Sequence, residues 1–403
     1  MTDIRFRGAV TPLRRPTDPL PRRVDALIAR LRPEEPLHCL RPATIGAAAR
    51  AFLAAFPGET LYAVKCNPEP AVLRALWAGG LRHFDCASIN EVRLVRSMFA
   101  DAAIHFMHPV KPRSAIREAW QRHGVRDFVL DSAAELAKLL QETEGGAGAL
   151  GLVIRLALPK GGAVYDLSGK FGAEPAEAVA LLRAARPHAA RLGVSFHVGS
   201  QCLEPAAYAR AIALAARVIR EAGVTVEILD VGGGYPVAYP DVVPPPLSAF
   251  TGAVADAVKA EGLSALALWA EPGRALVAGG TSVVVQVQHR RGDTLFVNDG
   301  VYGALSDAGA PGFRFPARLV RPSAAALAPF AFFGPTCDSA DHMKGPFLLP
   351  ADVAEGDWIE LGQLGAYGAS LRTAFNGFDR AGIVEVTDPP LLATPGYEVA
   401  AAA

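Results

Sequence analysis

Eight short β-prone runs, each followed by a longer helical pattern, lie between residues 61 and 273, and this alternation restricts the fold more than any other feature. Strands that alternate with helices in this way build a parallel sheet. Eight such units at this length favour a closed (β/α)8 barrel of the TIM type, with an open, doubly wound sheet as the alternative. The expected strands are 61–65, 83–87, 104–108, 127–131, 151–158, 193–199, 226–232 and 266–273.

The pattern changes after residue 275, where β-rich stretches with Gly and Asp at the turns replace the strand–helix alternation. We therefore expect an α/β barrel domain at 31–275 and a C-terminal, mainly antiparallel β domain at 276–403. The first 30 residues are rich in Arg and Pro and show no clean periodicity, and we expect them to pack on the β domain. The β-rich stretches are 281–290, 293–300, 331–337 and 357–368.

Charge and cysteine usage argue against several classes of protein. The chain has 40 basic and 40 acidic residues, so it lacks the positive field of a protein that binds nucleic acid or a membrane surface. Its five cysteines are scattered and form neither a metal-binding pair nor a disulfide framework. The first ten residues carry charges where a signal peptide needs an apolar run, and no stretch approaches about 18 uninterrupted apolar residues. We expect a soluble, cytoplasmic protein without a metal site.

Polar side chains stand at the ends of most of the expected strands. In a barrel of this kind the chemistry sits at the carboxyl ends of the strands, so these side chains are candidates for a common site. They include groups for acid–base chemistry and for binding cations and anions. The residues are Lys65, Asp85, His108, Asp131, Arg155, His197, Gly232 to Gly234 and Glu271.

Lys65 ends the apolar run YAVK, so we expect its ammonium group to lie partly out of water at the mouth of the barrel. Desolvation lowers the pKa of a lysine, which is what an imine-forming nucleophile requires. The alternative is a lysine that caps a strand and extends into water.

The glycine run 232–234 follows the seventh expected strand directly. Successive small residues let backbone N–H groups converge on a phosphate, and barrel phosphate sites often form after the last two strands. At the end of the eighth strand, Glu271 could pair with a protonated ring nitrogen and Arg274 could bind phosphate, or the two could form an internal ion pair. His197 could stack on an aromatic cofactor or be a satisfied core histidine.

A lysine nucleophile, a phosphate-binding turn, a carboxylate for a ring nitrogen and an arginine together describe a pyridoxal-phosphate site. With these residues in place, the chain resembles the eukaryotic-type ornithine decarboxylases, which belong to the fold-type III, alanine-racemase-like group. The resemblance runs from about residue 60 to 380 in the family's order. The motifs that carry it are YAVKCN (62–67), FHVGSQ (196–201), LDVGGGYP (229–236), AEPGR (270–274), NDGVYG (298–303), GPTCDSAD (334–341), GAYG (365–368) and FNGF (375–378).

The resemblance implies pyridoxal 5'-phosphate as the cofactor. Lys65 would bind it covalently, Glu271 would contact the pyridine nitrogen and His197 would stack on the ring. The residues that would hold the phosphate are Ser200, Gly233, Gly234, Arg274 and Tyr367. The residues that would support the lysine and the cofactor are Asp85, Glu91 and Arg155.

The resemblance also implies a substrate site shared between two subunits. Cys337 would donate a proton to the substrate α-carbon, and Asp338 would bind the distal amine. In this family both residues come from the partner subunit, so an obligate homodimer with two shared sites is expected. The other residues expected near the substrate are Tyr302, Phe375 and Asn376.

One departure from the family concerns the length of the substrate. Animal ornithine decarboxylases have a second aspartate several residues after the VYG motif, but Pro311 and Gly312 stand near that place here. Asp307 could replace it only if the loop folds differently. Asp338 stands where diaminopimelate decarboxylases usually have a glutamate, which favours a substrate that ends in an amine.

We therefore expect decarboxylation of a basic L-amino acid, foremost L-ornithine to putrescine and CO2, a reaction of polyamine biosynthesis. The first alternative is the same chemistry on lysine, on both amino acids, or on diaminopimelate or another amino acid. The second is of a different class: a non-catalytic, decarboxylase-like protein that binds and regulates partners. Such proteins lose the lysine, the cysteine or the phosphate site, and this sequence keeps all three.

Overall fold

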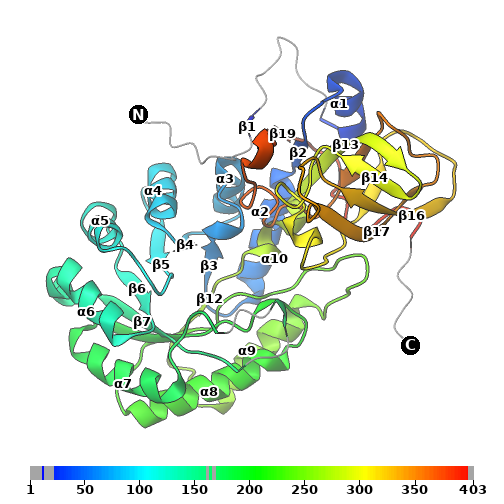
Figure 1. The fold of residues 1–403 in the computed structure, drawn as a ribbon. Helices are drawn as coiled ribbons and strands as arrows, with labels where there is room; N and C mark the ends of the chain where they lie inside the picture. Colours follow the sequence, from blue (N-terminus) through cyan, green and yellow to red (C-terminus); the bar gives the residue numbers. More distant parts are fainter. Residues whose placement is uncertain (1–10, 13–21, 160–162, 166–168, 398–403) are drawn as a thin grey trace. The chain divides into compact units, whose positions relative to one another are not determined.

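The eight expected strands close into one parallel barrel in the computed structural model, which describes residues 11–12, 22–159, 163–165 and 169–397 (Figure 1). Around the ring the order is β11-β12-β3-β4-β5-β6-β7-β9. The closed ring excludes the open sheet and confirms the predicted α/β barrel. Its strands are β3 (Glu59–Ala63), β4 (His83–Cys86), β5 (Ala103–Phe106), β6 (Asp127–Leu130), β7 (Gly151–Arg155), β9 (Arg191–Ser195), β11 (Ile228–Asp230) and β12 (Ala267–Ala270).

The helices between these strands begin and end at local sequence signals. Ser88 and Ser132 cap two of them, because each hydroxyl accepts a hydrogen bond from the backbone N–H three residues later. Gly124 and Gly223 end two others in the left-handed conformation, with φ of 67° and 65°. The helices are α2 (Pro42–Ala55), α3 (Pro70–Ala78), α4 (Ile89–Met98), α5 (Arg113–His123), α6 (Ala133–Glu142), α7 (Pro175–Ala185), α8 (Ala206–Ala222), α9 (Leu247–Ala260) and α10 (Arg274–Val277).

The interior of the barrel is a packed core. Apolar side chains from most of the barrel strands fill it, so polar chemistry is left to the strand ends. The central cluster consists of Leu61, Met107, Val129, Val153, Ile228 and Trp269, all buried.

The first barrel strand ends earlier than predicted. β3 stops at Ala63, and Lys65 lies in the 3-10 turn η1 (Val64–Cys66) instead of closing the strand. At this point the backbone N–H of Ala63 donates to the carbonyl of Pro272 (3.2 Å), which follows β12. Lys65 is therefore presented from a turn that packs against the end of the eighth strand.

The described residues group into two compact units. The barrel unit comprises 48–236 and 244–276, and the β unit comprises the chain up to residue 47, 237–243 and the chain from residue 277. The predicted domain limits at residues 30 and 275 stay a prediction. The sheet of the β unit is mainly antiparallel, as predicted, with parallel pairs between β14 and β16 and around β19. Its strands are β1 (Thr11–Pro12), β2 (Leu37–Leu40), β13 (Thr281–Arg291), β14 (Thr294–Val297), β15 (Ala317–Leu319), β16 (Leu327–Phe333), β17 (His342–Pro350), β18 (Trp358–Leu361) and β19 (Gly382–Glu385).

Five strands of this sheet were not predicted, namely β1, β2, β15, β17 and β19. β17 contains a Lys-Gly-Pro sequence that is typical of a turn, yet it pairs with β16 along most of its length. β2 and β19 are short, and each is stabilised by its neighbours rather than by its own pattern, since β2 pairs with both β13 and β19. A further two-stranded ribbon, β8 (Ala163–Tyr165) with β10 (Ser200–Cys202), was also missed.

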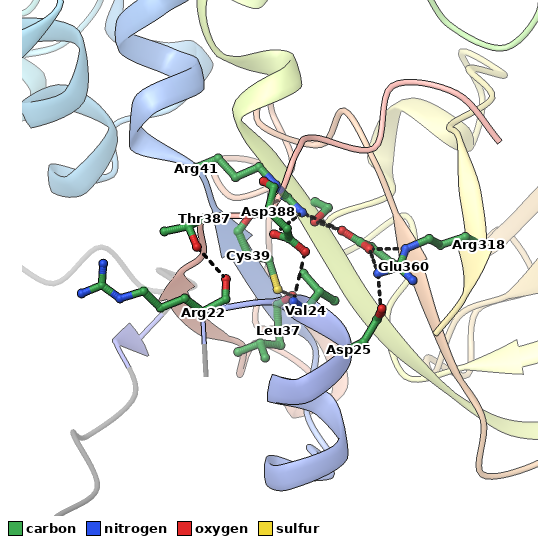
Figure 2. A network of polar contacts seen from close by, with 11 residues as sticks. Arg22, Val24, Asp25, Leu37, Cys39, Arg41, Arg318, Glu360, Thr387 and Asp388 are labelled. Atoms are coloured by element: carbon green, nitrogen blue, oxygen red, sulfur yellow. Dashed lines mark hydrogen bonds and ion pairs between the residues drawn. The ribbon is translucent and has the colours of Figure 1, made fainter. Parts of the chain in front are cut away.

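An ion network centred on the buried Arg41 and Glu360 joins the two ends of the chain within the β unit (Figure 2). Nη2 of Arg41 lies 3.0 Å from Oε1 of Glu360 and 3.2 Å from Oδ1 of Asp388. Arg318 donates to the other oxygen of Glu360 and also pairs with Asp25 of α1 (Val24–Leu31). The N-terminal expectation for residues 1–30 falls largely on 1–10 and 13–21, which lie outside the described residues.

Candidate active site

Lys65 forms an ion pair at the carboxyl end of the barrel. Its Nζ lies 3.0 Å from Oδ2 of Asp85, which comes from β4 and is 1% exposed, whereas the lysine side chain is 44% exposed. An accessible amine is thus held in place by a buried carboxylate. This arrangement suits a nucleophile that must meet a small molecule at the mouth of the barrel.

Glu91 lies beside this pair at the start of α4. Its Oε2 accepts a hydrogen bond from the backbone N–H of Ala87 (2.7 Å), the residue before the N-cap, while its own N–H donates to Oγ of the N-cap Ser88 (3.3 Å). Burial raises the pKa of Glu91 to about 7, against the lowering effect of the hydrogen bond from Ala87. Helix capping therefore fixes a carboxyl group with a near-neutral pKa beside Asp85 and Lys65.

Two buried carboxyl groups, Asp230 and Glu271, meet at the ends of β11 and β12. They are 0% and 4% exposed. Burial raises the pKa of Glu271 well above its ordinary value, and the carboxylates of Asp230 and Asp85 raise it further. Lys65 and Arg155, which ends β7, oppose that rise.

His197 presents a neutral ring to the same end of the barrel. Its Nδ1 accepts a hydrogen bond from the backbone N–H of Gly199 (3.0 Å). Its pKa lies well below the ordinary value because of burial, and the positive charges of Arg155 and Lys65 lower it further. A flat, uncharged imidazole suits stacking on an aromatic ring better than acid–base work at neutral pH.

The glycine turn after β11 forms a cradle that only glycine can build. Gly232 and Gly234 have φ of 70° and 100°. A Cβ at Gly233 would lie 2.5 Å from the carbonyl oxygen of Glu271, and one at Gly234 would lie 2.3 Å from that of Gly199. Among the backbone–backbone hydrogen bonds of the described residues, none is donated by Gly233 or Gly234. Two such N–H groups at one turn are an anion-binding arrangement.

The barrel residues fit a flat molecule that carries an aldehyde, a protonated ring nitrogen and a phosphate. Lys65 supplies an amine, and Glu271 supplies a buried carboxyl whose Oε1 receives no donor from the described residues. The glycine cradle leaves space that any Cβ would fill. Ser200 begins β10, and Arg274 begins α10 as a buried cation. The predicted barrel residues are therefore brought together, although their roles stay predictions.

Cys337 and Asp338 lie in a loop of the β unit, between β16 and β17. The thiol of Cys337 is exposed, and its backbone N–H donates to Oδ1 of Asn376 (3.0 Å). Asp338 accepts hydrogen bonds from the hydroxyl of Tyr302 and from the backbone N–H of Ala340 (3.0 Å). These bonds lower the pKa of Asp338, first that from Ala340 and then that from Tyr302. The loop thus displays a thiol beside a carboxylate that stays ionised.

Aromatic side chains flank this carboxylate. The rings of Tyr302 and Phe375 have centroids 5.0 Å apart, and the side chain of Phe375 is 41% exposed. The β unit therefore brings together Cys337, Asp338, Tyr302, Phe375 and Asn376, as the resemblance implied.

Two buried aspartates that were not singled out from the sequence shape these loops. Asp341 is 1% exposed and accepts from the backbone N–H groups of Val301 (2.8 Å) and Thr336 (3.1 Å), so it ties the NDGVYG loop to the GPTCDSAD loop. Asp299 forms a buried ion pair with Arg372 (2.6 Å). The signal in the sequence was their presence in Gly-rich turns after strands, where aspartate commonly accepts backbone hydrogen bonds.

Three more residues that the sequence singled out lie elsewhere. Two accept hydrogen bonds from nearby backbone groups, and the third belongs to the β unit. Asp131 accepts from the backbone N–H of Gly172 (3.0 Å), and Nδ1 of His108 accepts from that of Val110 (3.2 Å). Tyr367 belongs to the β unit, where its φ is 62°. Within the described residues, no group of three or more His, Cys, Asp or Glu side chains could hold a metal ion, and no helix could cross a membrane.

Comparison with known proteins identifies the family. Residues 43–278 match the pyridoxal-binding domain of pyridoxal-dependent decarboxylases, and residues 275–365 match the C-terminal sheet domain of these enzymes. The mouse ornithine decarboxylase is 32% identical over 375 residues, which cover 84% of this chain and 78% of that protein.

Two solved structures are similar over nearly their whole length. The arginine decarboxylase of Paramecium bursaria Chlorella virus has a TM-score of 0.79 at 28% identity, with 90% of this chain and 99% of that chain covered. The lysine/ornithine decarboxylase of Vibrio vulnificus, complexed with putrescine, has a TM-score of 0.77 at 32% identity, with 90% and 97% covered. The chain belongs to the pyridoxal-phosphate-dependent decarboxylases of basic amino acids, the family of ornithine decarboxylase.

Proposed function

We propose that this protein decarboxylates L-ornithine to putrescine and CO2, with its active sites shared between the two subunits of a homodimer. The observation that carries the substrate is Asp338, a partly exposed carboxylate oriented by Tyr302 and Ala340 beside the thiol of Cys337. An ionised carboxylate at this place suits a distal ammonium group. An aspartate here, where diaminopimelate decarboxylases usually have a glutamate, favours a substrate that ends in an amine over one that ends in a zwitterion.

The barrel residues would hold the cofactor in one orientation. Pyridoxal phosphate supplies an electron sink for the electron pair that is left when the α-carboxylate departs as CO2. Lys65 would bind its aldehyde carbon and be displaced by the substrate amine, and Glu271 would hold a proton on the ring nitrogen. His197 would cover one face of the ring, and Arg274 and the glycine cradle would hold the phosphate.

Cys337 would then deliver its thiol proton to the α-carbon and recover one from water. Positioned proton transfer of this kind contributes about 10²–10⁴-fold to a rate. Cys337 and Asp338 belong to the β unit and not to the barrel unit that contains Lys65. The resemblance to the family assigns them to the partner's site, which is the basis of the proposed dimer.

Lysine is the second candidate substrate, and a specific observation favours it. Pro311 and Gly312 stand where the second substrate-binding aspartate is expected, and Asp307 is only 7% exposed. With Asp338 as the single anchoring acid, the site would distinguish two chain lengths mainly by one methylene. Such a difference is worth about 1–3 kcal/mol, or about 10–200-fold in kcat/KM.

The test is release of CO2 from a panel of L-ornithine, L-lysine, L-arginine and diaminopimelate. We expect ornithine to be the best substrate and lysine to follow within about 10–200-fold in kcat/KM. Asp338→Ala should raise KM for ornithine more than it lowers kcat, whereas Asp256→Ala, which removes an exposed acid on α9, should change neither. A preference for diaminopimelate, or an unchanged KM in Asp338→Ala, would overturn the assignment.

The shared site can be tested separately. Lys65→Ala and Cys337→Ala subunits are each expected to be inactive, but mixing them should restore part of the activity, because one hybrid site then contains both residues. Mixed subunits that exchange without any recovery would show that each chain builds its own site. A chain that keeps Lys65 and Cys337 but releases no CO2 from any amino acid would instead support the regulatory alternative.

A further inference from the structure

Asn376 connects its own segment of the β unit to the backbone of Cys337. Its Oδ1 accepts a hydrogen bond from the backbone N–H of Cys337 (3.0 Å). The segment around Asn376 is held separately, because the backbone N–H of Thr373 donates to the carbonyl of Tyr302 (2.8 Å) and the ring of Phe375 packs on that of Tyr302. A fixed segment thus carries the amide that meets the residue expected to deliver a proton.

Asn376 and Gly377 form the centre of a tight turn. The backbone N–H of Phe378 donates to the carbonyl of Phe375 (3.2 Å), and the two residues between them have positive φ, 53° and 80°. This is the pattern of a type I′ turn, for which Asn-Gly is a preferred pair because both residues adopt the left-handed conformation readily. The turn explains why a residue such as Asn or Gly stands at position 376, but it requires nothing of the side-chain amide.

The residues on either side of Cys337 have anchors of their own. The backbone N–H and the hydroxyl of Thr336 donate to the buried carboxylate of Asp341, at 3.1 and 2.8 Å. The carboxylate of Asp338 is oriented independently, by the hydroxyl and backbone donors described above. These bonds hold the loop in place, but none of them involves the backbone N–H of Cys337. The bond to Asn376 fixes the peptide group at that N–H, and with it the direction of the Cα–Cβ bond that carries the thiol.

We propose that Asn376 is a positioning residue for proton delivery, and that its amide aims the thiol of Cys337 at the substrate α-carbon. The inference deepens the proposed function and rests on it. In the step concerned, the S–H bond of Cys337 breaks as the α-carbon gains the proton, and the thiolate regains a proton from water. Asn376 exchanges no proton itself and acts through the backbone of Cys337. Because Asp338 is oriented separately, the amide should affect the rate of this step and not the binding of the distal amine.

Two substitutions of Asn376 separate the amide from the turn. Asn376→Gly keeps the left-handed turn and removes the hydrogen-bond acceptor, whereas Asn376→Asp keeps both, since Gly-Gly and Asp-Gly also form type I′ turns. We expect Asn376→Gly to lower kcat by about 10–10²-fold and to leave KM nearly unchanged, because a displacement of about 1 Å at a reacting group can cost about 10²-fold. Asn376→Asp should retain most of the kcat of the parent, because its carboxylate still accepts from Cys337.

The kinetic constants distinguish positioning from two other roles of Asn376. A raised KM with an unchanged kcat in Asn376→Gly would mean that the amide binds the substrate. A kcat and a KM equal to those of the parent would mean that position 376 provides only the turn. Either result would overturn the proposal, and so would an Asn376→Asp variant as impaired as Asn376→Gly.

The hydrogen bond itself can be observed without turnover, in NMR spectra of the holoenzyme. The chain has five cysteines, so isotope-labelled cysteine gives five backbone amide signals, and Cys337→Ala identifies the signal of Cys337. We expect the Cys337 amide to exchange its proton with solvent faster in Asn376→Gly than in the parent or in Asn376→Asp, while the other four amides stay unchanged. An exchange rate at Cys337 that does not respond to Asn376→Gly would contradict the proposed link.

These measurements also distinguish this proposal from the proposed function. If another amino acid of the panel is the best substrate, the expected loss of kcat with that amino acid supports the role of Asn376 and refutes only ornithine. If the parent and Asn376→Gly decarboxylate ornithine equally fast, the substrate stands and the positioning role does not. A protein that releases no CO2 from any amino acid would refute both, because no proton is then delivered.

Discussion

The two ends of the same barrel both carry titratable clusters, but the clusters differ in how their polar atoms are paired. At the amino end, charged and ring groups from five strands contact one another in a row. At the carboxyl end, buried carboxyl oxygens lack donors although two cations lie nearby. The residues of the amino-end cluster are Glu59, His83, His105, Asp127 and Arg191.

The amino-end cluster forms a continuous chain of contacts. Nδ1 of His83 lies 3.1 Å from Nε2 of His105, whose Nδ1 lies 3.1 Å from Oδ2 of Asp127. Arg191 donates to both oxygens of Asp127, at 2.8 and 2.9 Å. Burial alone would raise the pKa of Asp127, but the interaction with His105 and the charge of Arg191 outweigh burial and lower it. Both carboxylates of this cluster are paired within it, although Nδ1 of His105 lies near Asp127 without hydrogen-bonding geometry.

At the carboxyl end, several buried carboxyl oxygens have no hydrogen-bond donor. Asp85, Asp230 and Glu271 each keep one buried oxygen without a donor from the described residues. A buried polar atom without a partner costs about 1–3 kcal/mol, so a ligand that supplies donors is stabilised by meeting them. The contrast teaches that a cluster of charged side chains in a barrel indicates a binding site where buried carboxylate oxygens lack donors, and indicates structure where the carboxylates are paired within the cluster.

The largest expected effect is that of removing a carboxyl group from the carboxyl-end cluster. Glu271→Ala should lower kcat by about 10²–10⁴-fold, because the ring nitrogen would lose the group that keeps it protonated. The melting temperature of the cofactor-free protein should stay the same or rise, since a buried acid with a raised pKa is removed. Steady-state kinetics and thermal unfolding check both, with Glu221→Ala, an exposed acid, as the control. A near-normal kcat would make Glu271 a structural residue.

A substitution in the amino-end cluster should instead lower the stability of the protein and leave kcat almost unchanged. Asp127→Ala removes the acceptor of His105 and Arg191, and it should lower the free energy of unfolding by about 1.5–3 kcal/mol, the range for hydrogen bonds to charged groups. The kcat of the folded enzyme should change less than twofold, because Asp127 begins β6 and does not reach the carboxyl end. Denaturant titration and activity at low temperature check these effects. A loss of kcat without a loss of stability would contradict the comparison.

Much of the barrel could be predicted from sequence because its signals are local. The alternation of strands and helices, and polar residues at strand ends such as Asp85 and Glu271, depend on short patterns. Lys65 was placed at the end of a strand because YAVK is uniformly apolar up to the lysine. In the structure the strand stops at Ala63, which donates to Pro272, a partner more than two hundred residues away that no local pattern contains.

Asp230 and the strand β2 also depend on partners that are distant in the sequence. Asp230 lay inside a recognised motif, yet its contact with Glu271 depends on the pairing of β11 with β12. The strand β2 was missed because its four residues acquire their structure from β13 and β19, which come from the other end of the chain. The sequence therefore predicted which residues lie in the same region. The hydrogen-bond and strand partners of these residues could be identified only from the closed barrel and the assembled sheet.

The smallest expected effect concerns pH, and it compares a histidine from each end. The pKa values of His83 and His197 are both lowered chiefly by burial, but that of His197 lies further below the ordinary value. His83 is less affected because Glu59 and Asp127 partly offset burial and the charge of His105. The unfolded chain binds these protons more readily than the folded barrel, so stability should fall as the pH decreases below about 6.5. Replacing either histidine with Gln should flatten this decline in denaturant titrations of the cofactor-free protein, and His83→Gln should flatten it less. If His83→Gln had the larger effect, the neighbouring acids would not compensate the buried imidazole, and the amino end would be less completely paired than its contacts indicate.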